Sequence, residues 1–119
     1  MSITYNLEYL NELASGDENF VYDMILEFIN STPESLKQMD SYIKEKKYSE
    51  LYKIVHRIIP TYEYIGNEEL INQLREIEKI AKYQENIENL KTIFNDINNK
   101  SHLLIDTLKN DFSEKIKNN

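Results

Sequence analysis

Apolar residues recur every three or four positions along most of this chain, the spacing that is typical of amphipathic α-helices. The first such segment covers residues 7–13 and stops at Ser15 and Gly16. Asp17 follows, and an aspartate here is a good N-cap because its carboxylate accepts a hydrogen bond from the first turn. The pattern therefore predicts a short N-terminal helix and a second helix from Asp17 to about residue 30.

Start and stop signals predict two further helices. Thr32 and Pro33 combine a hydroxyl at the N-cap with a proline in the first turn, where its missing N–H costs nothing. A third helix is therefore expected to run to about residue 46. Ser49 is the expected N-cap of a fourth helix, and Gly66 is expected to end it, because glycine readily adopts the left-handed conformation that closes a helix.

The C-terminal half of the chain predicts a fifth helix and a last one. Asn67 is the expected N-cap of the fifth. The last helix is expected to begin near Glu85. Ser101 interrupts its apolar stripe, and residues 98–100 are weak helix formers that are expected to fray or bend. From Ser113 onward the chain is polar and is expected to be disordered.

Together these elements predict an all-α fold, an up-and-down antiparallel four-helix bundle with one or more additional short helices at the N-terminus. Short connections between long amphipathic helices place successive helices side by side. With only two glycines and two prolines, the chain has few turn residues for a multistranded sheet. We expect a single domain over residues 1–112 and a tail over residues 113–119.

The charge and composition narrow the expected partners and location. Nucleic acid is bound through clustered lysines and arginines, whereas the 14 basic residues here are interspersed with 21 acidic ones, for a net charge of −7. The absence of cysteine fits a reducing compartment. No apolar run approaches the roughly 20 residues that span a bilayer. We expect a cytoplasmic monomer that binds neither nucleic acid nor membrane.

The fourth predicted helix carries one of two histidines, and a helical wheel shows where it points. At about 100° per residue, His56 lies about 140° and Pro60 about 180° from Leu51, so His56 is predicted to be exposed. Ile59 and Tyr52 lie at the edge of the apolar stripe, where the wheel allows either a core position or an exposed apolar rim. The stripe itself consists of Leu51, Ile54, Val55, Ile58, Tyr62 and Ile65.

The second histidine, His102, has no flanking pattern and is interpreted as a surface residue. A metal site of the Glu-x-x-His kind needs an acidic residue three positions before a histidine, but those positions hold Lys53 and Asn99. Because the chain also lacks cysteine thiolates, a metal-binding bundle is not supported.

His56, Ile58, Thr61 and Gly66 form a pattern that resembles the phosphorylated segment of histidine-phosphotransfer (HPt) domains. These helical modules carry phosphoryl groups between receiver domains in bacterial multistep two-component phosphorelays. The family segment reads roughly His-x-Leu-Lys-Gly-Ser, followed after four or five residues by Gly. The resemblance covers most of residues 5–110, and its outer parts are residues 6–10 and 15–20, Phe28, residues 32–34 and the pair Ile77-Glu78.

Two positions depart from the family pattern. Ile59 replaces the lysine that helps to hold the phosphoryl oxygens, and Pro60 replaces the following glycine. Lys53 and Arg57 either supply the missing positive charge or are ordinary surface cations paired with acidic neighbours. Pro60 is either a tolerated kink or part of the docking surface.

The resemblance implies that the chain is a phosphoryl carrier without kinase activity of its own. His56 would accept a phosphoryl group on Nε2 from a receiver aspartate and pass it to another receiver. The chain itself would need no cofactor, because the Mg²⁺ belongs to the receiver. The expected partners are receiver domains of a hybrid sensor histidine kinase or of a response regulator, docked on Tyr52, Ile59, Pro60, Glu63 and Tyr64.

Loss of the motif lysine leaves a second interpretation open. In it the chain is a degenerate HPt-like module that is not phosphorylated and binds a receiver or a kinase as an adaptor or regulator. We favour the carrier.

Overall fold

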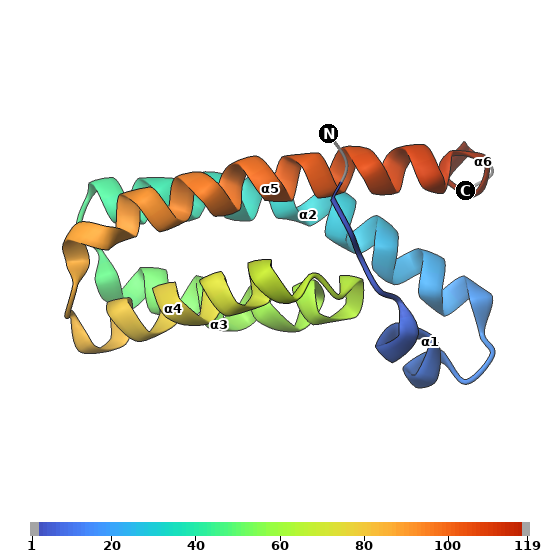
Figure 1. The fold of residues 1–119 in the computed structure, drawn as a ribbon, viewed down its shortest axis with the longest axis horizontal. Helices are drawn as coiled ribbons and strands as arrows, with labels where there is room; N and C mark the ends of the chain where they lie inside the picture. The colour runs from blue at the N-terminus through green and yellow to red at the C-terminus, as the bar shows by residue number, and fades with distance from the viewer. Residues whose placement is uncertain (1–2, 118–119) are drawn as a thin grey trace.

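The computed structural model describes residues 3–117, and every regular element among them is a helix (Figure 1). The helices are α1 (Glu8–Ala14), α2 (Glu18–Lys44), α3 (Tyr48–Ile65), α4 (Glu68–Tyr83), the 3₁₀ turn η1 (Ile87–Asn89), α5 (Leu90–Asp111) and α6 (Ser113–Lys117). None of the described helices is both long enough and apolar enough to cross a bilayer.

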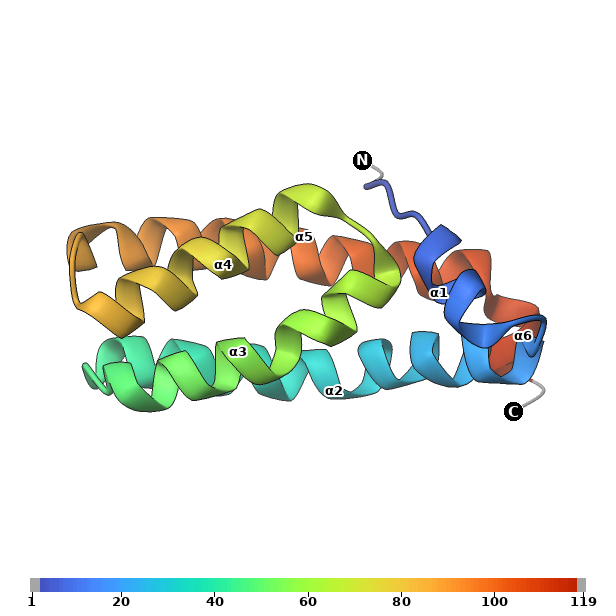
Figure 2. The ribbon, with the colours of Figure 1, turned by 90° about the horizontal axis from the view of Figure 1, so that it is seen from below.

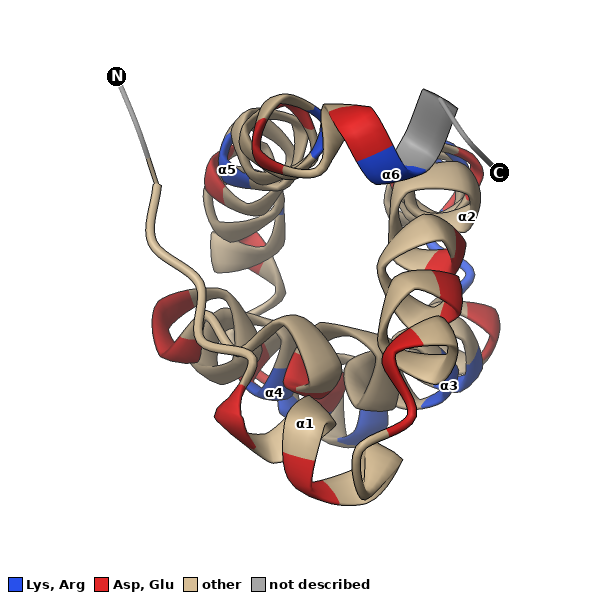
Figure 3. Cartoon of the chain, turned by 90° about the vertical axis from the view of Figure 1, so that its right-hand side faces the viewer, with Lys and Arg blue, Asp and Glu red and all other residues tan. Residues whose placement is uncertain are grey.

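The four long helices, α2 to α5, lie lengthwise in a molecule of 43 × 27 × 21 Å (Figures 1 and 2). Helix α3 packs against α2 and α4, and α5 packs against the same two helices. The view along the long axis shows these helices around a common centre, with α1 and α6 at one end (Figure 3). The result is an all-helical, bundle-like fold with one core.

The core between these helices is mostly apolar, and one side-chain hydrogen bond lies within it. The ring of Tyr62 meets the ring of Phe28 edge-on, with centroids 5.0 Å apart. Its hydroxyl pairs with the hydroxyl of Ser101 at 2.7 Å. Burial raises the pKa of Tyr62 well above its usual range. Ser101, which interrupts the apolar stripe of α5, is therefore a buried partner of Tyr62.

Two predicted N-caps and one predicted helix end are confirmed. Asp17 accepts a hydrogen bond from the N–H of Phe20 at 3.2 Å, and Asn67 accepts one from the N–H of Leu70 at 2.9 Å. Gly66 follows α3 with φ +73°. These signals act within one helical turn, which is why they can be read from neighbouring residues.

The predicted break at Thr32 and Pro33 is wrong, because α2 runs through both residues as one helix of 27 residues. Pro33 cannot donate to the carbonyl of residue 29, and an interior proline costs about 3 kcal/mol. The apolar stripe nevertheless continues in register across it, and Thr32 is buried at 3% exposure. The buried positions of this stripe are Val21, Ile25, Phe28, Ile29, Thr32, Leu36 and Met39.

Other boundaries also differ from the sequence predictions. Helix α3 begins at Tyr48, so Ser49 lies inside its first turn and does not cap it. The last long helix begins at Leu90 after η1, and residues 98–100 continue it without a break. Residues 113–117, predicted as a disordered tail, form α6, while residues 118–119 of that predicted tail lie outside the described residues.

Candidate functional site

Helix α3 presents His56 to solvent, as the helical wheel predicted. The side chain of His56 is 69% exposed. Lys53, Arg57 and Pro60 are exposed on the same helix. The opposite face of α3 is buried against α2 and α4. The amphipathic pattern of α3 therefore fixes the direction in which the histidine points.

Helix α4 supplies a carboxylate to His56. The Nδ1 atom of His56 lies 2.7 Å from Oε2 of Glu78, whose side chain is only 23% exposed. An ionised carboxylate can only accept hydrogen bonds, so Nδ1 donates and carries the proton. In the neutral ring, the lone pair is then on Nε2. Among residues 3–117, no hydrogen-bond partner of Nε2 is found.

An aromatic ring supports His56 from its own helix. Tyr52, one turn before the histidine, stacks on the imidazole with ring centroids 5.7 Å apart and an interplanar angle of 13°. Tyr52 is half-buried, so its position lies between the core position and the exposed rim that the wheel allowed. The stack from α3 and the hydrogen bond from α4 together restrain the position of the imidazole.

Two positively charged residues, Lys53 and Arg57, lie close to His56 in the sequence. Lys53 and Arg57 form no ion pair with any residue of the described chain. The acidic neighbour Glu63 is instead paired with Arg75 of α4, at 3.3 Å. The surface ion pairs with neighbours on α3 that the sequence allowed for Lys53 and Arg57 are therefore not formed.

The residues predicted to form a docking surface differ in their exposure to solvent. Pro60 is exposed, and Glu63 and Tyr64 are half-buried. Ile59 is only 6% exposed, so the prediction that it forms part of an exposed rim is wrong. Its place at the edge of the stripe leaves it close enough to the core to be covered.

Two contacts of this region could not be predicted from the sequence. Glu78 matches a family position, but nothing in the sequence pointed to a bond with His56, 22 residues away. Tyr9 of α1 stacks on Tyr64, with ring centroids 6.2 Å apart. Both are contacts between helices, for which the spacing within one helix gives no signal. His102 is exposed, as expected.

Comparisons of the chain with protein-family models, with curated proteins and with solved structures found no match in any of the three. Across residues 3–117, no three His, Cys, Asp or Glu side chains are grouped so that they could hold a metal ion.

Proposed function

We propose that this chain is a histidine-containing phosphotransfer protein of a multistep two-component phosphorelay, with the up-and-down four-helix bundle of HPt domains. The observation that supports the proposal most directly is the exposure and the hydrogen bonding of the His56 ring. Its ring is exposed, it is restrained by Tyr52, and its proton is held on Nδ1 by Glu78. Nε2 is thereby left as a nucleophile that faces a docking partner.

The proposed reaction follows from this arrangement. The lone pair of Nε2 attacks the phosphorus of an aspartyl phosphate on a receiver domain. The N–P bond forms as the bond from phosphorus to the aspartate oxygen breaks, and the aspartate leaves as a carboxylate. The same step in reverse passes the group to a second receiver. Such transfer depends mainly on positioning and on neutralising charge.

Neighbouring charges support both directions of this transfer. Glu78 stabilises the positive charge that develops on the imidazole when Nε2 is phosphorylated. Lys53 and Arg57, which are exposed and have no ion-pair partner in the described chain, can approach the phosphoryl oxygens. They are our candidates to replace the motif lysine.

The proposed partners are receiver domains of a hybrid sensor histidine kinase or of a response regulator in the cytoplasm. They would dock over Tyr52, Pro60, Glu63 and Tyr64, around the exposed histidine. The chain acts as a monomeric carrier in this proposal, and the phosphoryl group originates from the partner.

One observation favours a second candidate function, that of an adaptor which binds a receiver without being phosphorylated. The position of the motif lysine is Ile59, and its side chain is buried, so that position offers no charge to a phosphoryl group. An adaptor would use the same surface and retain the histidine without chemistry.

The test is transfer of labelled phosphate from a panel of phosphorylated receiver domains. We expect the wild-type chain to gain acid-labile, base-stable phosphate, as a phosphohistidine does, and the His56→Ala variant to gain none. His102→Ala, which removes the other exposed histidine, should be labelled like the wild type. Equal labelling of the His56→Ala variant would refute the carrier. Receiver binding without any labelling of the wild type would identify the adaptor.

A further inference from the structure

Helix α1 exposes two large apolar side chains at one end of the molecule. Tyr9 and Leu13 are 49% and 48% exposed, and they are four residues apart, so they lie on the same side of the helix. One face of the Tyr9 ring stacks on Tyr64 of α3. The fold thus holds the aromatic ring in a fixed orientation while much of it remains in contact with solvent.

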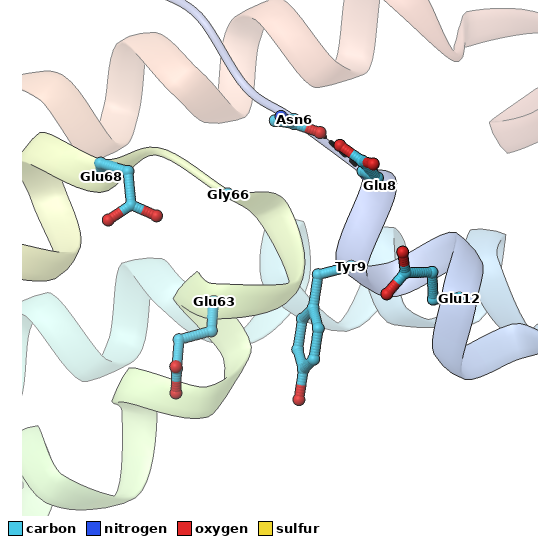
Figure 4. A pocket seen from close by; sticks show the side chains of 7 residues that line it. All are labelled: Asn6, Glu8, Tyr9, Glu12, Glu63, Gly66 and Glu68. Carbon is cyan, nitrogen blue, oxygen red and sulfur yellow. Dashed lines mark hydrogen bonds between the residues drawn. The ribbon is translucent and has the colours of Figure 1, made fainter.

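A shallow hollow of about 260 Å³ lies beside Tyr9, where α1 meets the junction between α3 and α4. Figure 4 shows the carboxylates of Glu63 and Glu68 on one side of the tyrosine ring and those of Glu8 and Glu12 on the other. We call the hollow, together with Tyr9 and Leu13, the α1 surface. The backbone at Gly66 forms part of its wall.

The charged side chains that line the hollow of the α1 surface are all acidic. Glu8, Glu12 and Glu68 form no ion pair with any residue of the described chain. Only Glu63 has a partner, Arg75, at 3.3 Å. Helix α1 itself contains no lysine or arginine, as the colouring of Figure 3 shows. An occupant that matches this surface must therefore carry positive charge.

The spacing of the carboxylates limits the kind of cation. None of them belongs to a group of three or more acidic residues, among those described, that could hold a metal ion. Carboxylates spread around an exposed aromatic ring instead fit a planar, delocalised cation. An arginine guanidinium stacks on tyrosine faces and forms hydrogen bonds with several carboxylates at once.

We propose that the α1 surface binds a basic segment of a partner protein. An arginine of this segment occupies the hollow beside Tyr9, and a neighbouring aliphatic side chain covers Leu13. A polyanion such as nucleic acid is repelled by the same carboxylates. The inference does not depend on phosphoryl transfer, because none of these residues holds the imidazole of His56.

The probe that tests this proposal is the peptide acetyl-Arg-Arg-Leu-Arg-Arg-amide, titrated into isotope-labelled full-length protein in about 0.15 M salt, where distant charges are screened. We expect amide shifts to change over residues 6–16 and 63–68. The triple variant Glu8→Gln/Glu12→Gln/Glu68→Gln should weaken binding about tenfold, since it removes three exposed carboxylates that each contribute a modest ion pair. Tyr9→Ala should weaken it about threefold.

A matched control separates this site from general attraction between opposite charges. Glu27→Gln/Glu34→Gln/Glu88→Gln removes three exposed carboxylates elsewhere and changes the net charge by the same amount. It should alter affinity by less than about twofold. Equal weakening by both triple variants, or shifts outside the α1 surface, would overturn the proposal. So would spermidine binding as tightly as the peptide, which would assign the hollow to a small polyamine. His56→Ala should bind the peptide like the wild type.

Discussion

The Glu78 carboxylate fixes the tautomer of His56 in the neutral ring. An isolated imidazole exchanges its proton between two nitrogens, and only the unprotonated nitrogen is a nucleophile. The 2.7 Å bond to Nδ1 comes from a side chain that is only 23% exposed. A partly covered carboxylate moves less than an exposed one, so the geometry at Nε2 is well defined.

Replacing Glu78 with glutamine tests this role. Glu78→Gln keeps the shape but removes the charge, and a hydrogen bond to a charged group is worth about 1.5 kcal/mol or more. Because the imidazole of His56 is largely exposed to solvent, part of this energy is lost to screening. We therefore expect transfer through His56 to slow by about threefold to tenfold in the variant. The ring ¹⁵N shifts of His56 should also show more of the tautomer protonated on Nε2.

The matched control is Glu76→Gln, which removes an exposed carboxylate from the same helix. It should change neither the transfer rate nor the ring shifts. If the Glu78→Gln variant slowed transfer without any change in the ring shifts, Glu78 would act on the docked partner and not on His56.

At the scale of the elements, the end of α3 depends on one residue, Gly66. Gly66 has φ +73°, and its N–H donates to the carbonyl of Tyr62 at 2.9 Å. The N-terminal segment passes directly over it, since the N–H of Asn6 donates to the carbonyl of Ile65 at 3.0 Å. A Cβ at residue 66 would overlap the backbone carbonyl oxygen of Asn6. Glycine is thus required both by conformation and by the close approach of another segment.

The two glycines of the chain allow these two requirements to be separated. Gly16 also has a positive φ, of 90°, but no atom lies within 4 Å of the position that a Cβ would take there. We expect Gly16→Ala to lower the free energy of unfolding by about 1 kcal/mol, the conformational cost alone. Gly66→Ala should lower it by roughly 3 kcal/mol, because the N-terminal segment must also move.

Urea denaturation of both variants measures this difference, and hydrogen exchange at the amide of Asn6 reports on the N-terminal segment. Exchange at Asn6 should accelerate in Gly66→Ala and remain unchanged in Gly16→Ala. Equal losses of stability in the two variants would show that the contact with Asn6 has no energetic importance.

At the scale of the whole molecule, the N-terminal segment joins helices that are far apart in the sequence. The side-chain amide of Asn67 donates to the carbonyl of Thr4 at 2.9 Å. The hydroxyl of Tyr5 donates to the carboxylate of Asp111, 106 residues away, at 2.7 Å. Burial and this contact with Asp111 raise the pKa of Tyr5 from 10.0 to about 12. The two ends of the described chain are therefore held together by a titratable group.

This raised pKa predicts a loss of stability in alkali. Between pH 10 and 12 the tyrosine ionises in the unfolded chain but not in the folded one. The unfolded state then binds fewer protons, so stability falls as the pH rises. The Tyr5→Phe variant lacks the hydroxyl, so its stability does not change with the ionisation of residue 5. We expect the variant to be about 1 kcal/mol less stable than wild type near neutral pH, with the gap closing between pH 10 and 12.

Urea denaturation across this pH range measures the gap. Tyr83→Phe, at an exposed tyrosine far from Asp111 in the sequence, is the control and should follow the wild-type profile. A gap between wild type and Tyr5→Phe that stays constant up to pH 12 would show that Tyr5 does not contribute to the alkaline loss.

The sequence by itself determined the features that depend on one helix at a time. The 3.6-residue period gave the helical class and the outward direction of His56, since both depend only on positions along a helix. The caps at Asp17 and Asn67 and the end at Gly66 are equally local. The resemblance around His56 likewise gave the proposed chemistry from neighbouring residues.

The tertiary structure decided every feature that depends on contact between elements. Helix α2 continues through Pro33 because packing on one side of a 27-residue helix outweighs the cost of one proline. Ile59 is buried because neighbouring helices cover the edge of the stripe on α3. Glu78 reaches His56 only because α3 and α4 pack side by side. Such contacts depend on how helices are placed in space, which the periodicity of a single helix does not specify.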